Sequence, residues 1–245
     1  AAVAQLVEVH YDQLPAVMTP AAALESDAPL VHEEAYSGSG DESFAAMAAA
    51  PDEKASARSR DNVTHEVKLE WGDVDRAFAD ADTIVENDVH YPMLYAYAME
   101  PYNAVANFQD SHLHVVSTAQ HPFMVRTDLA RIFSLPLSRV RVQVPYIGGG
   151  YGSKSYTKVE PLAAVGSWFT GRPVKLVLDV EEAIYTTRAD SADIHVRSAF
   201  DKSGHILARE FDLVLDSGAY ADNSPLVVAK AVNRCFGPYR VPNLR

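Results

Sequence analysis

The sequence predicts an α+β fold with mixed sheets, β-hairpins and packed helices. Two β-hairpin signals support it, because alternating apolar segments flank the polar turns Gln109–His112 and Asp201–Gly204. Elsewhere, helical apolar spacing alternates with short strand patterns, as after Gly72 and after Pro122. Hairpins and helix-linked strands in one chain favour a mixed architecture over a uniform doubly wound sheet.

The first 61 residues divide into two parts. Alternating apolar residues predict a strand over Leu6–Tyr11, which ends at Leu14-Pro15. Residues 37–61 are rich in Gly, Ser, Ala and charge, so we expect a linker or mobile loop there, with a short helix around Phe44–Ala50. The predicted domain boundaries are therefore 1–36, 37–61 and 62–245.

Residues 62–245 carry the regular elements. A helix follows Gly72, with Asp73 as its N-cap and Val74, Ala77 and Phe78 on its apolar face. Pro122 begins a second helix that ends near Leu135. The other expected elements, in order, are strands at Thr83–Tyr91, Ala104–Phe108, Leu113–Ser117 and Val140–Val144, a helix at Lys158–Phe169 that Gly171 ends, and strands at Val174–Val180, Asp193–Phe200 and His205–Leu215.

Composition narrows the classes of function. The chain has 21 Lys and Arg against 33 Asp and Glu, for a formal net charge of −12, so a nucleic-acid partner is not expected. No apolar stretch approaches the roughly 20 residues that a membrane span needs. The single cysteine, Cys235, excludes a disulfide framework or a cysteine-ligated cluster within these 245 residues, and we expect it to be a small buried thiol.

A glycine cluster, Gly148-Gly149-Gly150-Tyr151-Gly152, follows the predicted strand that ends at Val144. One interpretation is a tight turn, in which glycine supplies positive φ. A second is a phosphate-binding P-loop, because Lys154-Ser155 provides the expected ending, although Ser153 stands where that motif requires its second glycine. A third interpretation comes from the surrounding segments.

Several segments together resemble the molybdenum hydroxylase family of xanthine dehydrogenases and aldehyde oxidases. They occur in the family's order: Glu8–Val17, Val31–Glu33, Ala98–Pro101, Ser117–Pro122, Tyr146–Lys154, Thr170–Val174 and Gly237–Asn243. Each is weak alone, but together they cover nearly the whole chain. The resemblance implies the fold of a molybdenum hydroxylase large subunit. Residues 1–36 would form the tail of a hammerhead-like domain, and 62–245 the first part of the molybdopterin-binding domain.

The resemblance also implies a site for each matching residue. Gln120 matches a glutamine that approaches an oxygen ligand of molybdenum, and a neutral amide can hold such a ligand without competing for the metal. Gly149, Gly150, Tyr151 and Gly152 match a turn whose backbone lies beside the cofactor, with Tyr151 where many relatives have Phe. Ser155 matches a substrate-pocket position that is glutamate in purine-oxidising relatives, which weakens xanthine as the substrate. No protein side chain is expected to bind the metal, and Glu100 is expected to be structural.

The family oxidises N-heterocycles or aldehydes with water as the oxygen source. The implied cofactor is molybdopterin with molybdenum, in the cytosine dinucleotide form, with 2Fe-2S and FAD groups on an iron–sulfur subunit and a FAD subunit. The catalytic base is expected downstream of Arg245, in the rest of the molybdenum subunit, so no catalytic residue is assigned here and the isolated chain is expected to be inactive. The expected compartment is the cytoplasm. A non-catalytic assembly module and a P-loop-like nucleotide binder remain the alternatives.

Overall fold

The computed structural model describes residues 6–32, 62–220 and 224–245, which form two compact units. The first unit comprises residues 1–92 and 190–245, and the second comprises 93–189. Because the second unit interrupts the first, the sequence-based boundaries do not coincide with these units, and the division at 36 and 61 stays a prediction. The helix expected at 44–50 lies outside the described residues.

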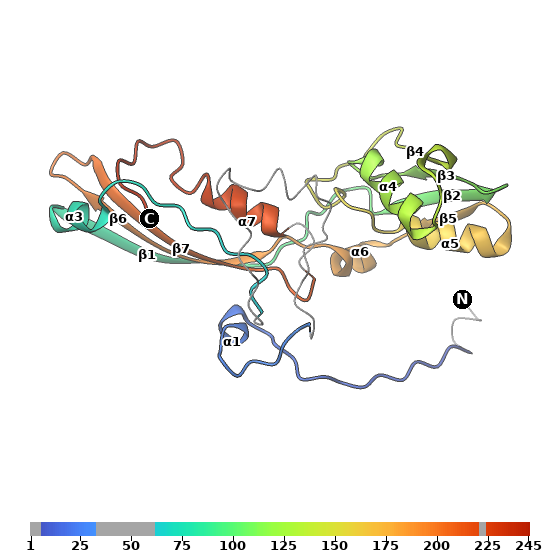
Figure 1. Cartoon of the computed structure of the whole chain (residues 1–245), viewed down its shortest axis with the longest axis horizontal. Coiled ribbons are helices and arrows are strands. Elements are labelled where there is room, and N and C mark those ends of the chain that lie inside the picture. The colour runs from blue at the N-terminus through green and yellow to red at the C-terminus, as the bar shows by residue number, and fades with distance from the viewer. Residues whose placement is uncertain (1–5, 33–61, 221–223) are drawn as a thin grey trace. The chain divides into compact units, whose positions relative to one another are not determined.

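The first unit is built on an antiparallel sheet in the order β1-β6-β7 (Figure 1). Its strands are β1 (Thr83–Tyr91), β6 (Ser191–Phe200) and β7 (Ile206–Asp216). Helix α3 (Val74–Ala79) begins at Asp73, whose side chain accepts the Arg76 N–H, and buries Val74 and Ala77 against Ala199 and Ala208. This unit also contains α1 (Pro20–Ala23) and α7 (Ser224–Val232).

The second unit is a four-stranded mixed sheet in the order β4-β3-β2-β5. Its strands are β2 (Asn103–Gln109), β3 (His112–Ser117), β4 (Val140–Gln143) and β5 (Val174–Val177), and its α-helices are α4 (Pro122–Ile132), α5 (Glu160–Thr170) and α6 (Val180–Thr186). β2 and β3 form the predicted hairpin, in which Asp110 and Ser111 both have positive φ, as a tight two-residue turn requires. β3 and β4 pair in parallel across the α4 connection.

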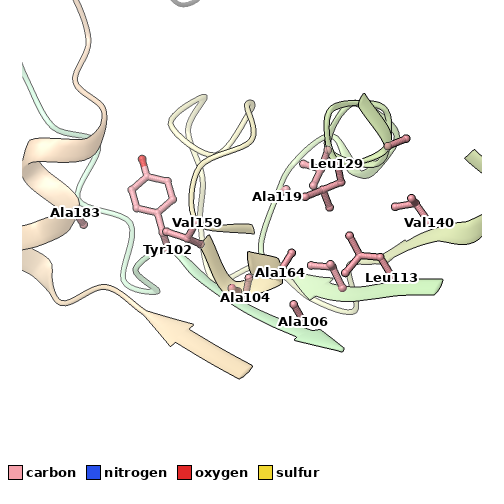
Figure 2. Close-up of a cluster of buried hydrophobic side chains, with 14 residues drawn as sticks. Tyr102, Ala104, Ala106, Leu113, Ala119, Leu129, Val140, Val159, Ala164 and Ala183 are labelled. Carbon is pink, nitrogen blue, oxygen red and sulfur yellow. The ribbon is translucent and has the colours of Figure 1, made fainter. Parts of the chain in front are cut away.

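The core of the second unit lies between its sheet and helices α4 and α5 (Figure 2). Ala104 and Ala106 alternate on the buried face of β2, where their small side chains admit the small residues of α5, including Ala164. Leu113 of β3 and Leu129 of α4 are completely buried in the same cluster. Each such leucine contributes roughly 2 kcal/mol through removal of apolar surface from water. This core holds the strand ends that carry the predicted site.

Two sequence expectations need correction, and three helices were not predicted. Leu6–Tyr11 is not a strand: its apolar side chains are exposed, and no described segment pairs with its backbone, which a strand requires. The strand expected over Val174–Val180 ends at Val177, because Asp179 and Glu182 form a reciprocal capping box that begins α6. Helices α1, α6 and α7 were not expected.

Candidate functional site

Two loops of the second unit meet at one edge of its sheet. The carboxyl ends of neighbouring parallel strands lie at the same edge, so the segment after β3 and the segment after β4 emerge together. Gln120 lies in the first segment and Gly149–Gly152 in the second. A hydrogen bond of 2.8 Å from the Gln120 N–H to the Lys154 carbonyl joins the two segments directly.

The Gln120 side chain is held against the glycine turn by its oxygen. Gln120 Oε1 accepts the N–H of Gly152 at 3.1 Å and the N–H of Lys154 at 3.3 Å. A backbone N–H can only donate, so the carboxamide must present its oxygen to the turn and its Nε2 group elsewhere. Within the described part of the chain, no hydrogen bond occupies Nε2. It is therefore a neutral donor with a fixed orientation.

The turn requires glycine at more than one position. A Cβ added to Gly150 would lie 2.5 Å from Gln120 Oε1, closer than any real Cβ contact. Gly149 and Gly152 have φ of 95° and 92°, which L side chains rarely adopt. Tyr151 has the left-handed φ of 52°, and its side chain is exposed. Gly150 is thus required by its close approach to Gln120, and Gly149 and Gly152 are required by their positive φ.

The backbone of the turn keeps donors for a ligand. The N–H groups of Gly149, Gly150 and Tyr151 make no hydrogen bond within the described residues, whereas those of the neighbouring Gly148 and Gly152 are bonded. Consecutive backbone N–H groups in a turn form a concavity that binds anionic oxygen. These groups and Gln120 Nε2 give the site a set of neutral donors.

Glu100 and Lys154 form an ion pair beside the turn. Glu100 Oε2 accepts the Gly148 N–H at 2.8 Å and Lys154 Nζ at 3.0 Å, and the Lys154 side chain is only 2% exposed. Burial of the Glu100 carboxyl raises its pKa, but the Gly148 hydrogen bond and the Lys154 ammonium outweigh burial and hold the pKa below the usual glutamate value. These contacts fit the structural role expected for Glu100.

The P-loop interpretation fits these contacts poorly. A P-loop lysine must reach the phosphates of a bound nucleotide. Here the Lys154 ammonium is buried and paired with Glu100, and the N–H groups of Gly148, Gly152 and Lys154 already have acceptors. Ser155, the candidate substrate-pocket residue, is half-buried just beyond the turn, and its N–H donates to the Gly152 carbonyl at 3.2 Å.

A buried contact that supports the Gln120 segment was not predicted from the sequence. Ser117 Oγ donates to Glu160 Oε1 at 2.5 Å and accepts the Ala119 N–H at 3.0 Å. Glu160 is buried at the start of α5, and its other oxygen accepts the Lys158 N–H. The sequence feature that could have indicated this contact is Glu160 itself, an acidic residue in the first turn of a predicted helix, where the helix dipole favours a negative charge. The contact fixes the end of β3 just before Gln120.

Cys235 is less buried than the sequence led us to expect. It is a half-buried free thiol, and burial raises its pKa. Among the described residues no group of three or more His, Cys, Asp and Glu side chains is arranged to bind a metal ion. No described helix is both long enough and apolar enough to cross a membrane.

Comparison with known proteins shows which family the chain belongs to. The family model of the molybdopterin cofactor-binding domain matches residues 56–245, which include Gln120 and the whole turn. The chain belongs to the molybdopterin-binding xanthine dehydrogenase and aldehyde oxidase family. The predicted family and the predicted fold class are confirmed.

Members of this family match the chain over nearly its full length. The large molybdopterin subunit of nicotinate dehydrogenase from Eubacterium barkeri is 31% identical over 242 residues, which are 98% of this chain and 51% of that protein. The large chain of carbon monoxide dehydrogenase from Hydrogenophaga pseudoflava is 32% identical over 97% of this chain and 29% of its own length. The chain therefore spans about half of the first relative and less than a third of the second.

A solved structure of the same family has the same fold. Reconstituted CO dehydrogenase from Oligotropha carboxidovorans superposes with a TM-score of 0.74 at 30% identity, over 98% of this chain and 29% of that one. The molybdopterin-binding family thus accounts for the architecture of both units.

Proposed function

We propose that this chain supplies one wall of the molybdopterin site in a molybdenum hydroxylase that oxidises an N-heterocycle or an aldehyde with water as the oxygen source. The observation that carries the proposal is the pair of hydrogen bonds from Gly152 and Lys154 to Gln120 Oε1. These bonds hold the Gln120 carboxamide next to the glycine turn with its oxygen facing the turn. The Nε2 donor therefore points away from the turn.

The residues present fit such a cofactor. Its oxygen ligands and phosphates are hydrogen-bond acceptors, and the site offers donors: Gln120 Nε2 and the N–H groups of Gly149, Gly150 and Tyr151. The missing Cβ at Gly150 leaves room for the Gln120 side chain to reach its position. The cofactor, when bound, supplies the redox chemistry of the reaction.

The tasks of this chain are binding and orientation. Gln120 would hold an oxygen ligand by a neutral N–H, which neither protonates the ligand nor competes for the metal. Glycine-turn amides would anchor the cofactor through the backbone, which stays fixed while side chains move. Tyr151 would add an exposed phenol to the pocket, and Ser155 would leave room where a bulkier acidic residue would favour purines.

The proposal extends to the assembly. The cofactor would be molybdopterin cytosine dinucleotide, and electrons would leave through 2Fe-2S and FAD groups on partner subunits. The catalytic base would come from the remainder of the molybdenum subunit, so the 245 residues alone would be inactive. We place the assembly in the cytoplasm. Support comes from the family membership, because relatives such as the nicotinate dehydrogenase subunit are large subunits of multi-subunit enzymes.

The experiment is turnover by the native assembly purified with this chain. A panel of N-heterocycles and aldehydes is supplied with an artificial electron acceptor in water enriched in oxygen-18. We expect dye reduction with at least one substrate and incorporation of the heavy oxygen into its product. Dye reduction without oxygen-18 in the product would refute the proposed reaction, and turnover by the pure single chain would refute the assignment of the base to another segment.

A further inference from the structure

Glu100 and Lys154 connect the two ends of the glycine turn to each other and to Gln120. We propose that this ion pair is a positioning device: it sets the turn and, through the Lys154 backbone, the orientation of the Gln120 carboxamide. The purpose of that orientation rests on the proposed function, but the mechanical claim concerns only residues of this chain.

The pair holds the start of the turn through Glu100. Its Oε2 accepts the Gly148 N–H at 2.8 Å, and its own N–H donates to the Gly148 carbonyl at 3.2 Å. A Cβ on Gly148 would lie 2.6 Å from the Glu100 Cβ, so the two backbones approach as closely as glycine allows. Both the N–H and the carbonyl of Gly148 are therefore hydrogen-bonded to Glu100.

The pair holds the end of the turn through Lys154. The Lys154 ammonium reaches the same Glu100 oxygen at 3.0 Å from a side chain that is almost fully buried. A buried ammonium is costly unless it is paired, so the lysine has one favourable position, which is fixed by Glu100. Glu100 Oε2 thus binds both ends of the segment from Gly148 to Lys154 and holds this segment as a closed loop.

Lys154 carries this constraint to Gln120. Its N–H donates to Gln120 Oε1 at 3.3 Å, and its carbonyl accepts the Gln120 N–H at 2.8 Å. A displacement of Lys154 would therefore move an acceptor and a donor of Gln120 at once. The paired side-chain groups of Glu100 and Lys154 act on Gln120 only through the Lys154 backbone. Both are therefore positioning residues, and this role distinguishes Lys154 from a phosphate-binding lysine.

Hydrogen–deuterium exchange in the native assembly tests this proposal. The probes are three of the hydrogen-bonded amides of the turn, those of Gly148, Gly152 and Lys154, and the main variant is Lys154→Met. Methionine replaces the buried ammonium by an unbranched apolar side chain, while the partly exposed Glu100 carboxylate loses its counter-ion but keeps its Gly148 donor. Glu100→Gln is the second variant, used if Lys154→Met does not assemble, because glutamine keeps an acceptor for Gly148.

Ser167→Ala is the matched control. Ser167 is fully buried in the same unit, accepts the Phe108 N–H at 2.9 Å and donates to the Arg172 carbonyl at 2.7 Å, but it does not contact the turn. Its loss lowers stability through an ordinary buried polar contact. Any general loosening of the second unit would therefore occur in the control too.

We expect exchange of the three turn amides to accelerate by about tenfold or more in Lys154→Met and to stay at the wild-type rate in Ser167→Ala. Molybdenum content should fall in Lys154→Met only. Unchanged exchange in a folded Lys154→Met or Glu100→Gln assembly would overturn the proposal, as would equal acceleration in the control. A wild-type assembly without molybdenum would instead refute the proposed function, and the exchange rates would still decide whether the ion pair positions the turn.

Discussion

The side-chain oxygen of Gln120 accepts the backbone N–H of Gly152 at 3.1 Å, across a separation of 32 residues in the sequence. This bond determines which end of the carboxamide faces the glycine turn. The orientation of Gln120 thus follows from the chemistry of the backbone amides, and its Nε2 donor is left for a ligand.

Gln120→Glu separates the two roles of this side chain. A carboxylate retains an oxygen for the N–H groups of Gly152 and Lys154, so the turn should stay in place. It cannot donate a hydrogen bond, and it repels an anionic ligand. We expect turnover of the assembly to fall by about 100-fold or more while molybdenum content is retained, since a lost preorganised donor costs that much in other enzymes. Wild-type turnover in this variant would show that Nε2 has no role in the reaction.

Ser117→Ala should destabilise the protein without removing a contact of the glycine turn. Glu160 Oε1 would lose its donor in a buried position, and the Ala119 N–H would lose its acceptor. An unsatisfied buried group costs roughly 1–3 kcal/mol, so the free energy of unfolding should fall by about that amount in a denaturant titration. The control is Ser138→Ala at an exposed serine, expected to stay within about 0.5 kcal/mol of wild type. Equal stability of the two variants would contradict the importance of the Ser117–Glu160 contact.

His195 of β6 should titrate above the ordinary histidine range. Its Nδ1 lies 2.7 Å from Asp88 Oδ1, and this hydrogen bond raises the pKa of His195 above 6.5. The folded state therefore favours the imidazolium. Its stabilising contribution is fully present below pH 6.5 and is lost as the pH rises through the folded-state pKa. Histidine NMR should show a lower His195 pKa in Asp88→Asn than in wild type, and identical titration curves would exclude Asp88 as the cause.

Much of the fold was predictable because its signals are local. Turn chemistry at Asp110-Ser111 and at Asp201–Gly204 placed both hairpins, and Thr83–Tyr91 was predicted with the bounds that β1 has. The sequence pattern fails where a strand depends on a distant partner strand or where a helix-capping signal competes with an apolar segment. Leu6–Tyr11 alternates like a strand but has no described partner strand, and the capping box at Asp179 overrides the apolar run that precedes it.

The site was predictable only in part. Gln120 and the glycine turn could be singled out by their resemblance to a family, and the parallel β3–β4 pairing explains why they meet. The Glu100 and Lys154 contacts could not be derived from the sequence. Nothing in it shows that one Glu100 oxygen accepts hydrogen bonds both from the Gly148 N–H and from the Lys154 ammonium, which lies 54 positions away. Likewise, the choice between a phosphate-binding and an ion-paired lysine depends on burial, which sequence pattern alone did not reveal.

The most direct test of the central claim is the molybdenum content of the native assembly with Gly150→Val. The added side chain would begin 2.5 Å from Gln120 Oε1 and displace it from the turn. Gly171→Ala is the control: Gly171 has a positive φ, but a Cβ there meets nothing within 4 Å, so only a stability cost of about 1 kcal/mol is expected. We expect Gly150→Val to retain less than about a tenth of wild-type molybdenum and Gly171→Ala to retain nearly all of it. A folded Gly150→Val assembly with full molybdenum content would contradict the claim that Gln120 and the glycine turn together form a wall of the cofactor site.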